Sequence, residues 1–242
     1  SSGGPTRRLI SNYIYMTTQD YIEQDIHIAI KDIPDNTYNL IYTSPPYGIT
    51  TAEWDKPLNW TMLFPEMWRV LKDDGIIVLH CSMPFTYELL KYETPRYHYS
   101  WKKNTKTGFF QAKKQPLRNV EEVLVYYKKT GTYNPQMIGS NVIKTKHRKC
   151  DLAKNKYYQG GVGDGPLPDT SHTGLYPSTL LEYSIRKDGS GINRGDDMMD
   201  FFIKTYSNEN DYVLDMTCHN HHLGNRCKEL ERNYLGIDIC LT

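Results

Sequence analysis

The chain has 242 residues, of which 38% are hydrophobic and 24% are charged, and its formal net charge is +1. This length suits one large domain with a buried core, and the composition is ordinary for a globular protein. A net charge this close to zero gives no overall argument for a polyanionic partner. No apolar run approaches the ~18 residues of a membrane-spanning helix.

The termini and the cysteines bear on where the chain works. Residues 1–5 resemble the remnant of an expression tag, and no signal peptide is visible. The five cysteines are odd in number and scattered, which suits a reducing compartment better than a disulfide framework. We therefore predict an intracellular location: cytoplasm or nucleoid, or, for a viral protein, the particle or the host nucleus. Four of the cysteines are interpreted as packed or surface thiols: Cys81, Cys150, Cys227 and Cys240.

Apolar periodicity predicts the elements in the first half of the chain. Residues 20–31 mix helical and strand periods, and a turn at 34–36 leads into a buried strand over Tyr38–Thr43. A helix over 59–71 should end at a Gly75 cap, because glycine tolerates the left-handed conformation. Further elements follow in order: a strand over 75–81, a helix over 84–92, and strands near 97–102 and 120–127.

The second half begins with a different composition. Residues 131–177 are polar, basic and rich in Gly and Pro, which is typical of an insertion; an unstructured surface loop is an equal alternative for 154–173. The pattern predicts an amphipathic helix over 196–207. The last elements form a βαβ unit by length and pattern: a strand over 212–217, a helix over 223–232 and a strand over 234–239.

The hexad Thr43-Ser44-Pro45-Pro46-Tyr47-Gly48 ends the first apolar strand. Two consecutive prolines fix φ twice and remove two backbone donors, so the sheet ladder cannot continue there. The result is a rigid loop at the carboxyl end of a strand, which is where ligands bind in open α/β sheets. Taken alone, the motif also fits a structural turn that merely ends a strand.

Two basic stretches are candidates for a nucleic-acid face. Such a face needs cations for phosphates and flat rings for displaced bases. For either stretch taken alone, a solvated charged surface is an equal alternative. The first stretch is interleaved with aromatic residues that include Phe109 and Phe110. The cations are, in the first stretch, Lys102, Lys103, Lys106, Lys113, Lys114 and Arg118, and in the second, Lys144, Lys146, His147, Arg148 and Lys149.

The order of these features resembles the β-group of DNA amino-methyltransferases. The likeness starts with the hexad, Trp54-Asp55 and the strand at 75–80; the segments 106–118, 121–129 and 132–136 resemble phage and bacterial members. The group transfers a methyl group from S-adenosylmethionine to adenine N6 or cytosine N4. The resemblance implies an α/β, Rossmann-like methyltransferase fold, with a mostly parallel seven-stranded sheet and helices on both faces. Residues 6–242 would form a single domain, with 131–177 as a target-recognition-like region.

The resemblance also implies roles for individual residues. Ser44 would accept a hydrogen bond from the amino group of a flipped base, and Tyr47 would be the platform for that base, held by Pro45 and Pro46. Asp in place of Ser44 is usual in the adenine enzymes, and serine is common in the cytosine-N4 enzymes. The implied cofactor-binding residues are Asp215, Thr217 and Asp238, and the implied nucleic-acid residues are Lys106, Lys113, Lys114 and Arg118.

The chain departs from the family where the cofactor should bind. A Gly-x-Gly-rich turn is replaced by Cys218-His-Asn-His-His222, and Gly224 comes too late to substitute. The family's His-Pro-Thr-Gln-Lys-Pro segment is replaced by Gly-Ile-Asn-Arg-Gly-Asp at 191–196. The chain also ends at Thr242, whereas relatives continue into a helix that encloses adenine; another polypeptide would supply that wall, unless the boundary was chosen experimentally. Bulky imidazoles should crowd the pocket, so the cofactor turn is interpreted as broken.

Two functions follow from these observations. The first is a degenerate methyltransferase without cofactor, acting as a structural, DNA-binding or regulatory partner. Its partners would be DNA and an active paralogous subunit or a second copy, and not a membrane. The alternative is an active enzyme that uses S-adenosylmethionine and prefers cytosine N4. No metal site is predicted, because consecutive histidines rarely converge on one ion.

Overall fold

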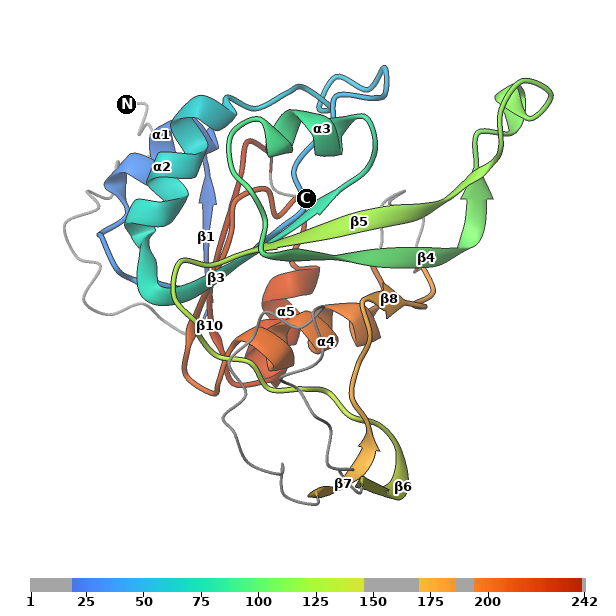
Figure 1. The fold of residues 1–242 in the computed structure, drawn as a ribbon. Coiled ribbons are helices and arrows are strands. Elements are labelled where there is room, and N and C mark those ends of the chain that lie inside the picture. Colours follow the sequence, from blue (N-terminus) through green and yellow to red (C-terminus); the bar gives the residue numbers. More distant parts are fainter. Residues whose placement is uncertain (1–18, 146–169, 186–193, 241–242) are drawn as a thin grey trace, which may run out of the picture. The chain divides into compact units, whose positions relative to one another are not determined.

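The computed structural model describes residues 19–145, 170–185 and 194–240 (Figure 1). Within them, the residues up to Asn134 and from Thr179 onward form one compact unit, and those within Pro135–Ser178 form a second. Helices long and apolar enough to cross a membrane are not found in these ranges. Some sequence predictions lie outside the described residues: the cations of the second basic stretch from Lys146 to Lys149, Cys150, and most of the segment at 191–196.

The first unit is built on an eight-stranded sheet with the order β1-β10-β9-β2-β3-β5-β4-β8. The first five strands in that order are parallel, whereas β5 pairs antiparallel with both β3 and β4. The predicted mostly parallel α/β sheet is confirmed, with a two-residue edge strand, β8, in addition to seven. The strands are β1 (Gln19–Glu23), β2 (Tyr38–Thr43), β3 (Leu71–Cys81), β4 (Tyr97–Thr107), β5 (Arg118–Tyr126), β8 (Leu180–Leu181), β9 (Tyr212–Asp215) and β10 (Asn233–Asp238).

Successive side chains of a strand point to opposite faces of the sheet. Both faces of this sheet are apolar, so each forms a core that helices cover. On β3, Ile77 and Leu79 belong to one core and Ile76 and Val78 to the other. The first core is closed by α1 (Ile26–Ala29), the 3₁₀ turn η2 (Ile30–Asp32), α2 (Trp60–Val70) and α3 (Phe85–Leu90). The second is closed by α4 (Asp196–Tyr206) and α5 (His222–Glu229).

The predicted end of the second helix is wrong. We expected the helix to run to Leu71 and stop at a Gly75 cap, but α2 ends at Val70 and Leu71 already pairs with Tyr38 in the sheet. The next pair is Leu40 with Ile76, so residues 72–75 form a bulge in β3. Strand pairing at Leu71 therefore outweighs the local helix signal.

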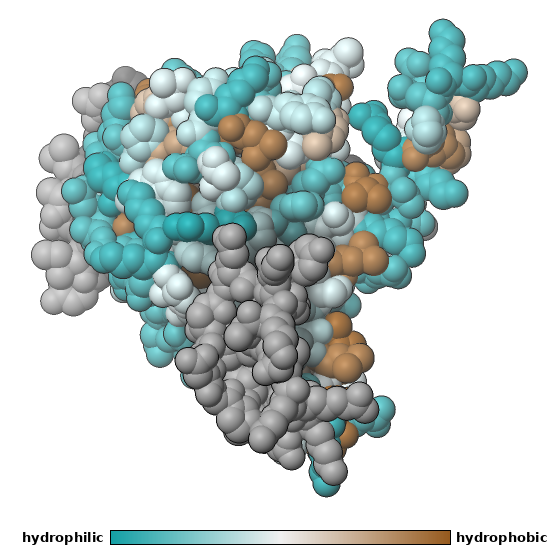
Figure 2. Space-filling model, viewed as in Figure 1, coloured by the Kyte–Doolittle hydropathy of each residue, from teal (hydrophilic) through white to brown (hydrophobic). Residues whose placement is uncertain are grey.

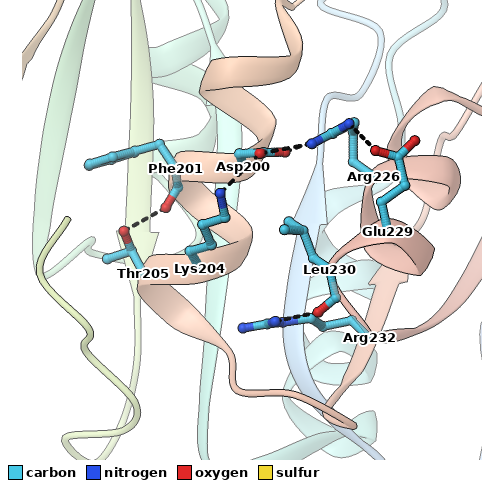
Figure 3. A network of polar contacts seen from close by, with 8 residues as sticks. All are labelled: Asp200, Phe201, Lys204, Thr205, Arg226, Glu229, Leu230 and Arg232. Atoms are coloured by element: carbon cyan, nitrogen blue, oxygen red, sulfur yellow. Dashed lines mark hydrogen bonds and ion pairs between the residues drawn. The ribbon is translucent and has the colours of Figure 1, made fainter.

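Charged side chains join the two helices on the second face (Figure 3). Arg226 of α5 donates from Nε to Asp200 Oδ1 at 2.7 Å and from Nη2 to Oδ2 at 2.9 Å. Lys204, one turn along α4, donates to the same carboxylate at 3.1 Å. This bidentate geometry fixes α5, and with it the turn that precedes α5, against α4.

The second unit contains a strand pair. β6 (Ile138–Thr145) and β7 (Thr170–Leu175) are antiparallel, with Ile143 opposite His172. The predicted insertion at 131–177 overlaps this unit, Pro135–Ser178; that these residues are an insertion in a single domain stays a prediction. Residues 170–173, for which a surface loop is the alternative to an insertion, belong to β7. A role of this unit in target recognition stays a prediction.

Candidate active site

Three neighbouring parallel strands end at the same edge of the sheet, and each carries predicted site residues there. Ser44 to Tyr47 follow β2, Asp215 ends β9, and Asp238 ends β10. The Oγ1 atoms of Thr43 and Thr217 lie 2.9 Å apart, which joins the loop after β2 to the turn after β9. The predicted catalytic and cofactor-binding residues are therefore brought together.

Asp55 organises the chain that leaves Tyr47. Its buried carboxylate accepts the backbone N–H groups of Gly48 at 2.7 Å, Ile49 at 2.9 Å and Thr50 at 2.7 Å. Burial opposes its ionisation, yet these bonds and one from the Thr50 hydroxyl hold the pKa of Asp55 below its usual value. Gly48 has φ +65°, a left-handed conformation that a side chain would strain. The loop is rigid on both sides of Tyr47.

Tyr47 itself is held by contacts from two distant elements. Its ring stacks on Phe85 of α3, with centroids 5.4 Å apart and planes at 20°. Its hydroxyl donates to Glu121 Oε2 over a long 3.4 Å, and Glu121 pairs with Lys103 Nζ at 2.6 Å. One face of the ring is thus occupied by Phe85, so the predicted stacking on a base would have to use the other face.

Arg194 is a site residue that the sequence did not identify. Its Nη2 donates to Ser44 Oγ, and its Nε is buried with no hydrogen-bond partner among the described residues. Arg194 forms an isolated antiparallel β-bridge with Ile185. This pairing helps to place Arg194 beside Ser44, although the two residues are 150 positions apart in the chain. The only available signal was that a cation stands in the segment that departs from the family.

Asp215 is buried beside this guanidinium. Burial raises the pKa of Asp215 to about 6, against the lowering effects of the Thr217 N–H, the Thr43 hydroxyl and the positive charge of Arg194. The Thr217 N–H donates to Oδ1 at 3.2 Å, and the Tyr234 hydroxyl to Oδ2 at 3.4 Å. The pKa of this carboxyl at the end of β9 is therefore closer to neutral pH than that of an ordinary aspartate.

The turn after β9 keeps a backbone of the kind that glycine favours. His219 has φ +54°, and its N–H donates to Asp238 Oδ2 at 2.8 Å. The side chains of His219 and His221 are exposed, and the His221 ring packs edge-on against Tyr21 of β1 at 4.2 Å. The expectation that three imidazoles crowd the cofactor pocket stays a prediction; in the structure, two of the three side chains are exposed.

Gly224 serves α5 rather than the turn. A Cβ at this position would lie 2.1 Å from the Tyr21 hydroxyl oxygen, so only glycine allows the helix to approach β1 and β10 so closely. The histidine-rich segment does not gather metal ligands, since no group of three or more His, Cys, Asp or Glu side chains in the described ranges could hold an ion.

The predicted nucleic-acid residues lie apart from this cluster, on β4, β5 and the connection between them. Two cations of that stretch are already paired: Lys102 with Glu182 at 3.0 Å, and Lys103 with Glu121. The four residues predicted to contact nucleic acid, Lys106, Lys113, Lys114 and Arg118, are exposed.

Comparisons with known proteins agree with this geometry. Residues 38–241 match the N6/N4 family model described as DNA methylase. The chain is 25% identical over 230 residues to the type II methyltransferase M.HpaI of Haemophilus parainfluenzae, covering 87% of this chain and 67% of that protein.

Solved structures share the fold. The cytosine-N4-specific PvuII DNA methyltransferase matches with a TM-score of 0.64 and 13% identity, over 93% of this chain and 83% of that one. The M1.HpyAVI–SAM complex matches with a TM-score of 0.56 and 22% identity, over 91% and 93%. With the loop after β2 and the acidic strand ends in one site, the chain belongs to the N6/N4 DNA methylase family.

Proposed function

We propose that the protein is an active, S-adenosylmethionine-dependent DNA amino-methyltransferase that prefers cytosine N4 to adenine N6. One observation carries this proposal: the Ser44–Tyr47 loop and the two acidic strand ends meet at one edge of the sheet, joined through Thr43 and Thr217. A base-binding loop and a nucleoside-binding turn must adjoin for group transfer between their ligands.

The residues present fit the cofactor. Asp238, at the end of β10, is placed to accept ribose hydroxyls, as the carboxylate that ends the second strand does in Rossmann-like sites. Asp215 offers a carboxyl to an ammonium group. The buried Nε of Arg194 has no hydrogen-bond partner in the described residues, which suits an anionic carboxylate. The left-handed backbone at His219 keeps the turn in the conformation expected of a glycine.

The cofactor, when bound, supplies an electrophilic methyl group. The protein's part is to hold the amino nitrogen of an extruded base in line with it. Ser44 Oγ takes one hydrogen bond from Arg194 and retains a second lone pair, with which it accepts a base N–H and turns the nitrogen lone pair toward the methyl group. Tyr47 stacks on the base with its free face.

A second candidate is the degenerate scaffold, which would bind DNA or another subunit without cofactor. The observation that favours it is that Arg194 already donates to the oxygen that the base would need. A turn without glycine, at Cys218 to Leu223, points the same way.

The first prediction separates these candidates. We expect the protein to bind S-adenosylmethionine with micromolar affinity in a calorimetric titration and to transfer its tritiated methyl group to unmethylated plasmid DNA. Mass spectrometry of the digested nucleosides should then find N4-methylcytosine. Ser44→Ala should bind the cofactor as the parent does but transfer the methyl group about 100-fold more slowly, because an unoriented amino group loses alignment. If the titration gives no heat of binding and methyl transfer is undetectable, only the degenerate scaffold without cofactor remains.

The second prediction concerns the DNA contact. Replacing Lys113, Lys114 and Arg118 by glutamine should weaken DNA binding and reduce the slope of log affinity against log salt by roughly 2 to 3, because each lost phosphate contact removes about 0.9. Lys102→Gln is the matched control, since that ammonium is already paired with Glu182. Fluorescence anisotropy between about 50 and 200 mM salt measures the slope. An unchanged slope in the triple variant would mean that these cations are only solvated surface.

A further inference from the structure

β4 and β5 continue beyond the rest of the sheet as a two-stranded ribbon (Figure 1). Their neighbours stop pairing early: β3 follows β5 only to Glu122, and β8 meets β4 only at Ser100 and Trp101. Farther out, the ribbon is closed by the pair Thr107–Arg118. The tip, residues 108–117, is therefore held in solvent on a narrow stem.

The tip presents two aromatic side chains on an ordered turn. Gly108, at φ +90°, leads into the 3₁₀ turn η3 (Phe109–Gln111), which is closed by the Gln111 N–H on the Gly108 carbonyl at 2.9 Å. Phe109 is 65% exposed, and Phe110 is 108% exposed. Two adjacent unburied phenyl rings on a rigid turn indicate that a partner covers them.

Charge indicates the kind of partner. Residues 104–118 contain no acidic side chain. The four exposed cations of the ribbon, Lys106, Lys113, Lys114 and Arg118, have no ion pair within the described part of the chain, unlike Lys102 and Lys103 nearer the sheet. Figure 2 shows the projecting end as a largely hydrophilic surface beside a smaller apolar patch. Apolar rings surrounded by unpaired cations suit duplex DNA, whose phosphates attract the cations and whose stacked base pairs can accept an inserted ring.

We propose that the tip is a wedge, in which Phe110, supported by Phe109, enters between stacked base pairs while the surrounding cations bind the flanking phosphates. Apolar side chains inserted in this way unstack a base step and bend the duplex. The proposal rests on DNA being the substrate. The ribbon is also linked to the Ser44–Tyr47 loop, because Glu121 of β5 accepts a hydrogen bond from the Tyr47 hydroxyl. An unstacked step near the target lowers the cost of extruding a base.

Plasmid topology tests the wedge without knowledge of the target sequence. A relaxed closed-circular plasmid is reclosed by topoisomerase I while the protein is bound, and the change in linking number is read on a gel. We expect the parent protein to change the linking number and the Phe109→Ala/Phe110→Ala variant to lose most of that change at equal occupancy. Its affinity should fall about tenfold, as for one lost stacking contact. Phe110→Trp should preserve the change.

Tyr133→Ala is the matched control, because Tyr133 is an exposed aromatic residue beyond the opposite end of β5, and it should behave as the parent. An undiminished change in linking number for the double alanine variant at equal occupancy would overturn the wedge. The wedge would also be overturned if the parent protein saturated the plasmid without changing its linking number. The tip would then contact a protein partner or no partner at all. Tritiated methyl transfer separates the two proposals: transfer without unwinding removes the wedge alone, and unwinding without transfer removes the enzymatic function alone.

Discussion

Asp215→Asn is expected to stabilise the fold by about 3 kcal/mol near pH 8 and to leave its stability unchanged below about pH 4. The pKa of Asp215 is raised to about 6 in the folded protein by burial, whereas an unfolded aspartate titrates near ~3.9. Between these values the folded state binds more protons, so the free energy of unfolding falls as pH rises through this window. Asparagine removes the ionisation and can keep the bonds to Thr217 and Tyr234.

Urea denaturation of parent and variant between about pH 4 and 8 measures this difference. Asp200→Asn is the control of opposite sign. Burial disfavours the Asp200 carboxylate, but Arg226 and Lys204 hold its pKa below the usual value, so its contribution is present at neutral pH and lost in acid. Parent and Asp215→Asn curves that run parallel across the pH range would show that this carboxyl is not desolvated. The same variant should bind S-adenosylmethionine more weakly, since the charge opposite the ammonium group is gone.

Glu121→Ala is expected to lower the free energy of unfolding by about 3 kcal/mol, because it leaves the Lys103 ammonium largely buried without a counter-ion. The Lys103 and Glu121 side chains are 12% and 17% exposed, and their charged atoms are 2.6 Å apart. Removing Glu121 also removes the hydrogen bond from the Tyr47 hydroxyl. We therefore expect methyl transfer to fall more than stability alone explains.

The chain offers a matched pair for this experiment. Lys102 and Glu182 meet at 3.0 Å, but their side chains are 51% and 60% exposed, so Glu182→Ala should cost less than ~1 kcal/mol. Adding Lys103→Met to Glu121→Ala should recover much of the lost stability, since the stranded charge is then removed as well. Equal effects for Glu121→Ala and Glu182→Ala in chemical denaturation would contradict the importance of burial at the first pair.

Some features were predictable because they depend on residues close together in the chain. Two prolines after Tyr38–Thr43 end that strand wherever it lies, so the rigid loop that carries Ser44 and Tyr47 could be predicted locally. The same is true of α4 and of the final βαβ unit, whose periods match their observed bounds closely. Where local signals competed, as between the helix end and strand pairing at Leu71, the sheet decided.

The sequence by itself determined the α/β class and the strand ends that carry the site, because apolar periodicity and proline geometry act over a few residues. The family followed from the resemblance of its motifs in order along the chain. Only the tertiary structure decided the environment of each polar group. Arg194 reaches Ser44 across 150 residues, and Glu121 reaches Tyr47 across 74. Neighbours that are distant in the sequence decide how deeply each group is buried. They therefore set the pKa of Asp215, the pairing of Lys103 and the exposure of His219, and no local pattern encodes them.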